Sequence, residues 1–187
     1  MENVATAQAV ERDELIVAEL HRLGVTHLAR LSVVTSQQDW EPKDLLAALA
    51  SHSEARFQAS LILLFLRRPE YGHAVGDALA TLDSRTSTSL KLYYQAAAYL
   101  QRELAPELST RLSNWEPLND LFSQALGLPA AASIGPGHQT ANKALQQLGA
   151  LHAKHSGWNV NWAGAYLQNI PLLLRHLPQP AGERPHA

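Results

Sequence analysis

Leucine and alanine make up most of the apolar side chains in this sequence, and nowhere do β-branched or aromatic residues alternate regularly with polar ones. Strands are usually built from β-branched and aromatic residues, whereas leucine and alanine have high helix propensity. The isoleucines are few and widely separated along the chain. The apolar residues therefore predict an all-α fold.

Apolar residues three and four positions apart indicate where the helices lie. In the first helix Ile16, Leu20 and Leu23 share one face, and Gly24 follows where a C-terminal cap belongs. Thr26 is suited to cap a short helix through about Val34. The longer helices are predicted over residues 5–23, 42–49, 53–66, 70–82, 88–104, 117–126, 139–154 and 161–177.

Two of these helices have recognisable local signals. Ser51 and Glu54 are spaced as a capping box, in which each side chain bonds to the other residue's free backbone N–H. The helix over 88–104 carries Lys91, Gln95 and Arg102 on one side. We expect that polar side to face solvent.

The chain of 187 residues has the length of one domain. We predict a single compact bundle of about seven to eight helices over residues 1–177, with residues 178–187 as a flexible C-terminal tail. The segments 53–66 and 69–82 have the dimensions of a helical hairpin, so stacked hairpins are one form that the bundle could take. Pro171 should kink the last helix, because it removes one backbone N–H.

Composition excludes several classes of chemistry. The chain has no cysteine, which excludes disulfides, thiolate nucleophiles and cysteine-ligated metals. Its longest apolar run, 61–66, is far shorter than the roughly 20 residues of a membrane span. With no signal peptide in view, we expect a soluble cytoplasmic protein that has no membrane partner.

Charge is divided unevenly along the chain. Residues 1–120 contain 11 Lys or Arg and 16 Asp or Glu, whereas residues 121–187 contain 4 Lys or Arg and 1 Asp or Glu. The non-functional interpretation is a chance fluctuation in composition. The functional interpretation is a basic face in the last third that meets an acidic protein, or RNA.

One short motif fits an enzyme class. All-α ribonucleases of the HEPN type carry an arginine and a histidine separated by four to six residues, a pair that polarises an RNA phosphodiester. Arg68 and His73 have this spacing at the start of a predicted helix. So short a motif also arises by chance, and it identifies no family. We keep a metal-independent ribonuclease using Arg68 and His73 as an alternative.

Histidine spacing gives little support to a metal site. His152 and His155 would lie on one side of a helix, but zinc needs at least a third ligand, such as His138 or His73. Histidines near a helix C-terminus are more often explained by the helix dipole. We therefore expect no metal and no cofactor.

An aromatic strip stands out near the C-terminus. Trp158, Trp162 and Tyr166 are four residues apart and would share one helical face, with Asn161 beside them. Tryptophan and tyrosine are enriched in binding hot spots. They also bury large areas in protein cores, so the strip is either core or a partner-binding face.

The sequence predicts a non-enzymatic helical module that binds another protein, such as an adaptor or an antitoxin-type regulatory partner. This hypothesis depends mainly on the lack of catalytic motifs, and its candidate partner-binding residues are Trp158, Asn161, Trp162 and Tyr166. The ribonuclease is one alternative. A small-ligand-binding helical bundle, lined by the same aromatic residues, is another.

Overall fold

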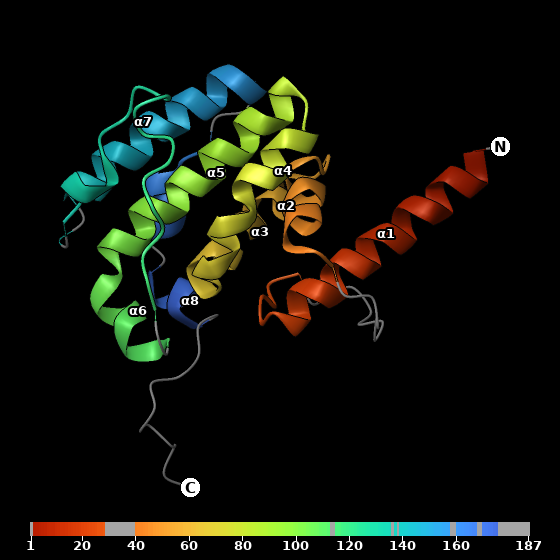
Figure 1. Cartoon of the computed structure of the whole chain (residues 1–187), viewed down its shortest axis with the longest axis horizontal. Coiled ribbons are helices and arrows are strands. Elements are labelled where there is room, and N and C mark those ends of the chain that lie inside the picture. Colours follow the sequence, from red (N-terminus) through yellow and green to blue (C-terminus); the bar gives the residue numbers. More distant parts are fainter. Residues whose placement is uncertain are drawn as a thin grey trace, which may run out of the picture.

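The computed structural model describes residues 2–28, 40–112, 115–135, 137, 139–157, 160–167 and 170–175. In these residues every regular element is helical, which confirms the predicted all-α class (Figure 1). The elements are α1 (Glu2–Arg22), α2 (Pro42–Ala50), α3 (Ala55–Arg67), the 3-10 helix η1 (Pro69–Ala74), α4 (Val75–Thr81), α5 (Ser84–Glu103), α6 (Ala105–Arg111), the 3-10 helix η2 (Ala131–Ser133), α7 (Gln139–Ser156), the π-helix η3 (Ala163–Leu167) and α8 (Ile170–Arg175).

Helix α5 occupies the centre of the bundle. It packs against α3 on one side and α7 on another, and it also contacts α2, α6 and η2 (Figure 1). Contacts on so many sides bury nearly every residue from Leu90 to Glu103. The expected solvent-facing stripe is therefore wrong at Gln95, whose side chain is fully buried.

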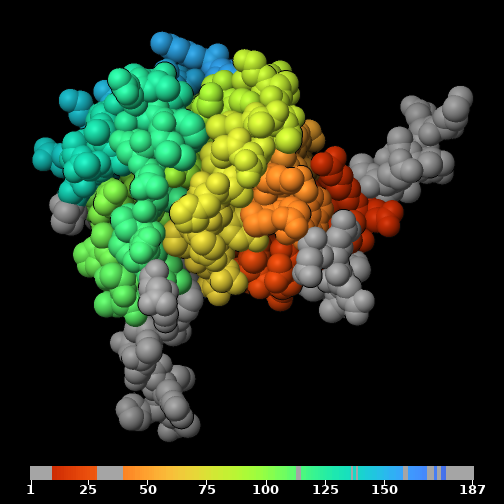
Figure 2. All heavy atoms as spheres, in the orientation of Figure 1, coloured from red at the N-terminus to blue at the C-terminus, as the bar shows by residue number. Residues whose placement is uncertain are grey.

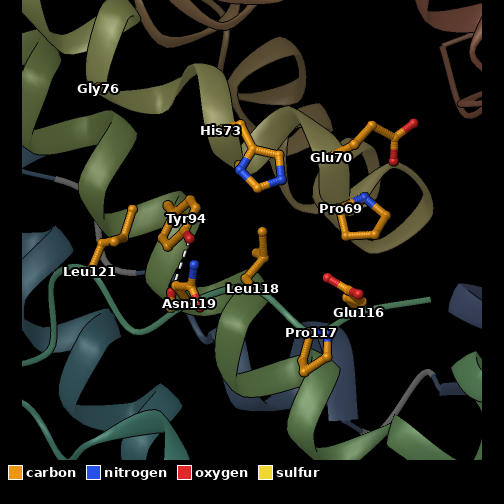
Figure 3. Close-up of a pocket in the computed structure, with 11 residues that line it drawn as sticks. Pro69, Glu70, His73, Gly76, Tyr94, Glu116, Pro117, Leu118, Asn119 and Leu121 are labelled. Carbon is orange, nitrogen blue, oxygen red and sulfur yellow. Dashed lines mark hydrogen bonds between the residues drawn. The ribbon is translucent and has the colours of Figure 1, made fainter. Parts of the chain in front are cut away.

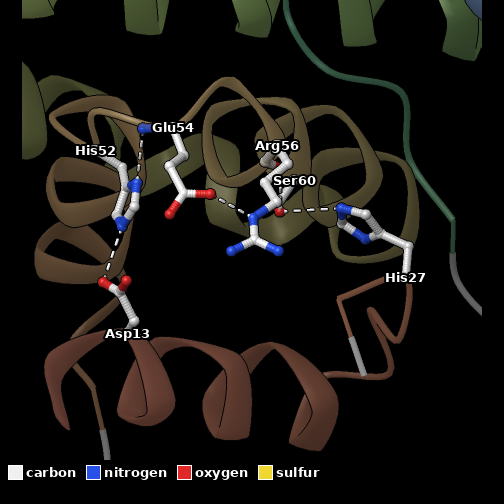
Figure 4. A network of polar contacts seen from close by, with 6 residues as sticks. All are labelled: Asp13, His27, His52, Glu54, Arg56 and Ser60. Carbon is white, nitrogen blue, oxygen red and sulfur yellow. Dashed lines mark hydrogen bonds and ion pairs between the residues drawn. The ribbon is translucent and has the colours of Figure 1, made fainter. Parts of the chain in front are cut away.

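Helix α1 lies along one side of the bundle and is joined to it by apolar and polar contacts. Ile16 and Leu20 are completely buried. Asp13 contacts His52 (2.9 Å) and His27 contacts Ser60 (3.2 Å), so each pair links the α1 region to the α2–α3 region (Figure 4). Gly24 follows α1 with a φ of 84°, as a C-terminal cap requires.

Local signals at helix ends were partly misleading. The expected capping box does not form, because α2 ends before Ser51 and α3 begins after Glu54 without a side-chain cap. The backbone N–H of Glu54 instead donates to Nδ1 of His52 (3.0 Å). Asp83 caps α5 by accepting from the backbone N–H groups of Arg85 and Thr86.

The predicted helix over 117–126 is wrong. Residues 115–128, here called the strap, contain no α-helix, and a short helix that the sequence analysis missed, α6, precedes them. Side chains of α5 hold the first part of the strap: the N–H of Leu118 donates to Oε1 of Gln101 (2.7 Å), and Tyr94 donates to the carbonyl of Asn119 (2.9 Å). The second part bonds to itself in turns, as where the N–H of Leu126 donates to the carbonyl of Phe122 (2.9 Å).

Several predictions fall wholly or partly outside the described residues. The segment 26–28 forms a turn and no helix, and residues 29–39 are not described. The predicted last helix is seen as η3 and α8, with Pro171 in the first turn of α8. Trp158, His138 and the expected tail 178–187 lie outside the described part. None of the described helices is long and apolar enough to cross a bilayer.

The burial of Trp162 predicts a large loss of stability on truncation. Its side chain is 1% exposed, and its ring stacks on Tyr93 with 5.1 Å between centroids. We expect Trp162→Ala to lower the free energy of unfolding by about 3–5 kcal/mol, measured by urea denaturation. Val10→Ala, at a side chain that is 53% exposed, is the control and should change it by less than about 0.5 kcal/mol. An unchanged stability of Trp162→Ala would contradict a core position.

Candidate functional site

A pocket of about 380 Å³ opens between η1–α4 and the strap. In the space-filling view the strap (teal) runs beside the η1–α4 segment (yellow) (Figure 2). Figure 3 shows Pro69, Glu70 and His73 of η1 on one side and strap residues on the other, with Tyr94 of α5 between them. Its volume lies within the range of about 300–1,000 Å³ that is usual for ligand pockets.

The two walls of the pocket approach each other closely at Gly72. A Cβ atom at this position would lie 2.6 Å from Cδ2 of Leu118. Leu118 is buried and belongs to the apolar core. Only a glycine therefore allows η1 to contact the strap this closely.

Hydrogen bonds to a buried side chain, Gln101, and to an exposed one, Asp120, fix the strap wall. Gln101, which is fully buried, accepts from the N–H of Leu118 and donates to the carbonyl of Phe65 (2.8 Å). Asp120 accepts from the N–H of Ala131 (2.6 Å) and from the hydroxyl of Ser123 (2.7 Å). Burial alone would raise the pKa of Asp120, but these hydrogen bonds hold it below its ordinary value of 3.8.

The pocket combines carboxylates with apolar surface. Glu70 and Glu116 line it and are both exposed. The apolar lining comes from Pro69, Pro117, Leu118 and Leu121, and Leu121 is unusually exposed for a large apolar side chain, at 49%. Such a surface suits a cationic group that is carried next to an apolar one.

The Arg68–His73 pair is not assembled around this pocket. His73 lines the pocket, but Arg68 does not. Nη1 of Arg68 lies 3.4 Å from Oε1 of Glu70, in a surface ion pair. Glu70 and Glu116 would repel an RNA phosphodiester at His73, so the geometry gives the ribonuclease alternative no support, and that alternative stays untested.

The pocket also lacks a nucleophile that His73 could activate. Its lining contains no serine, threonine or lysine among the described residues. The hydroxyl of Tyr94 is the nearest candidate, but it donates to the carbonyl of Asn119. Burial and the nearby charge of Asp120 raise the pKa of Tyr94 to about 12, which keeps it protonated at neutral pH.

The structure separates the members of the aromatic strip that it describes. Trp162 lies in the core against Tyr93 and His152. Asn161 is exposed, and its side-chain oxygen accepts from the N–H of Gly164 (2.9 Å). Tyr166 is half-buried, and burial together with Tyr93 raises its pKa above the ordinary value. Partner binding by Asn161 and Tyr166 stays a prediction.

A shallow groove runs beside this strip along α7. Gly149, Ala150 and Ala153 of α7 line it, together with Asn161 and Trp162. The groove is compatible with the predicted interaction face. None of the described residues that line it is charged, so it has no charged side chain that would select a partner.

The two histidines of α7 make different contacts. His152 is buried against Tyr93 and Trp162, and its Nδ1 lies 3.2 Å from the hydroxyl of Ser156. Nε2 of His155 lies 3.3 Å from the hydroxyl of Ser89. Within the described residues, no three histidine or acidic side chains are grouped so that they could hold a metal ion.

The close packing at Gly72 predicts a compensating pair of substitutions. Gly72→Ala should cost about 1–3 kcal/mol of unfolding free energy, because the new methyl overlaps Leu118. In a Leu118→Ala background the same substitution should cost almost nothing. Gly76→Ala, where no atom lies near the added Cβ, is the control. Equal costs in both backgrounds, measured by urea denaturation, would show that the overlap with Leu118 is not the cause.

The lowered pKa of Asp120 predicts a pH-dependent contribution to stability. A carboxylate whose pKa is lower in the folded state stabilises the fold above its unfolded pKa. That contribution is lost as the pH falls through the folded pKa. We expect Asp120→Asn to be less stable than the unmodified protein at pH 7, with the difference shrinking below about pH 4. Thermal melts across pH would detect this, and a constant difference would contradict it.

No protein-family model, no curated protein and no solved structure matches this chain. The chemistry of the described residues is therefore the basis for any functional proposal.

Proposed function

We propose that this protein is a non-enzymatic interaction module, and that the pocket between η1 and the strap binds a partner segment with a basic side chain next to an apolar one. The observation that carries the proposal is that two carboxylates, Glu70 and Glu116, and an exposed leucine, Leu121, line the same pocket, the leucine at the end away from the carboxylates (Figure 3). In this proposal the protein acts in the cytoplasm as an adaptor or an antitoxin-type regulator, and this pocket is the site that binds its partner.

Charge complementarity supports a basic partner at this pocket. Glu70 pairs with Arg68, and such an exposed pair at 3.4 Å contributes at most about 1 kcal/mol. A ligand cation can therefore compete for Glu70. All of the residues that line the pocket except Leu121 lie in the part of the chain with excess negative charge, residues 1–120. The acidic partner expected from the sequence was assigned to the basic last third, residues 121–187.

Rigidity supports binding as well. The strap is held by Gln101 and Tyr94 of α5, so its wall exists before any partner arrives. A preformed site loses less conformational entropy on binding than one that must be ordered. The exposed side chain of Leu121 would be covered in the complex, which adds hydrophobic burial to the charge pairs.

Selection from a random peptide library would test the proposal directly. We expect peptides that bind the unmodified protein to be enriched in lysine or arginine next to a large apolar residue. A selected peptide should bind Glu70→Gln/Glu116→Gln about tenfold more weakly, since each exposed charge pair contributes up to about 1 kcal/mol. Binding should also weaken with added salt.

A matched control removes the same charge elsewhere. Asp44→Asn/Asp77→Asn changes two exposed carboxylates that do not line the pocket. It should bind the peptide as the unmodified protein does. Selection of acidic peptides, or equal binding by the two double variants, would refute the proposal.

A further inference from the structure

A second pocket, of about 330 Å³, lies where three helix ends meet. The C-terminus of α2, the N-terminus of α5 and the C-terminus of α7 each contribute residues to it. Hydroxyl side chains are frequent in its lining, along with Arg85, His52 and His155. None of the described residues that line it is acidic.

The acidic side chains near this pocket are already engaged. Asp83 caps α5 and also accepts from the hydroxyl of Thr86 (2.8 Å). Asp13 contacts His52, and Glu54 is paired with Arg56 (2.6 Å) (Figure 4). The guanidinium of Arg85 forms no ion pair with any described residue. Arg85 therefore brings to the pocket a positive charge that no ion pair in the described part of the chain neutralises.

His52 forms one wall of the pocket. Its Nδ1 accepts from the backbone N–H of Glu54 (3.0 Å), and its Nε2 lies 2.9 Å from Oδ1 of Asp13. The ring stacks on Phe57 with 3.8 Å between centroids, which holds its orientation. Both ring nitrogens are used within the protein, and Arg85 is the source of permanent positive charge.

Hydrogen-bond donors reach the pocket from several directions. Arg85 and Ser89 are four residues apart on α5, so they share one face of that helix. Ser89 also contacts His155 of α7. The hydroxyls of Ser51 and Ser53, from the connection between α2 and α3, bond to no other group in the described part of the chain.

We propose that this pocket binds the phosphate group of a small phosphorylated molecule. A tetrahedral oxyanion accepts hydrogen bonds in several directions, as these donors require, and arginine binds phosphate oxygens in a bidentate manner. The carboxylate of Asp83 already occupies the N-terminus of α5, so the attraction comes from Arg85 and the hydroxyl donors. The volume leaves room for a small organic group besides the phosphate.

Isothermal titration calorimetry at low ionic strength and pH 7 would test this site with inorganic phosphate, ribose 5-phosphate and ribose. We expect at least one of the phosphates to bind with a Kd below about 1 mM, and ribose not to bind. Tighter binding of ribose 5-phosphate identifies a phosphate ester as the ligand class, whereas equal binding identifies the free ion.

Two variants on α5 decide whether the binding is specific. Arg85→Gln should weaken it by about tenfold or more, because it removes the charged donor. Lys91→Gln removes the same charge from the same helix outside the pocket and should leave binding unchanged. Both positions retain some exposure, so both variants should fold, as melting curves will show. The proposal would be overturned if neither inorganic phosphate nor ribose 5-phosphate binds, or if the two variants lose affinity equally.

Discussion

The structure depends on a constraint at α5, a helix that is buried on most sides and yet carries polar side chains. Buried polar groups must find hydrogen-bond partners, because their loss of hydration is otherwise uncompensated. Gln101 is satisfied by the backbone of α3 and of the strap, and Tyr94 and Tyr99 donate to the carbonyls of Asn119 and Pro129. The helix therefore fixes the path of a long segment that has little regular structure of its own.

Both pockets depend on this helix. Tyr94 contributes to the pocket under the strap, and Arg85 and Ser89 contribute to the pocket near the N-terminus of α5. Gln101 positions the strap wall without lining either pocket, whereas Glu70 and Arg85 line the pockets that would contact ligands. Substitution of Gln101 would disturb the strap wall and stability together, whereas changes at Glu70 or Arg85 alter the charge of one exposed group.

The sequence predicted the helices whose apolar faces are regular, such as 42–49 and 139–154, and the all-α class with them. It did not predict the strap, because the side chains that hold its first part, Gln101 and Tyr94, lie on α5 and are distant in the sequence. Gln95 was expected at the surface for a similar reason: helical spacing cannot show that a polar side faces another element. The pocket acids had no motif, and only His73 among the lining residues was a candidate from sequence.

The two pockets carry opposite local charges, although the net charge of the chain is only −2. The strap pocket presents Glu70 and Glu116, whereas the pocket at the end of α5 presents Arg85 without a lining carboxylate. A phosphate is repelled by the first pocket and attracted by the second, and a lysine side chain has the reverse preference. The two pockets therefore select ligands of opposite charge, so a basic peptide segment and a phosphorylated small molecule would not compete for one site.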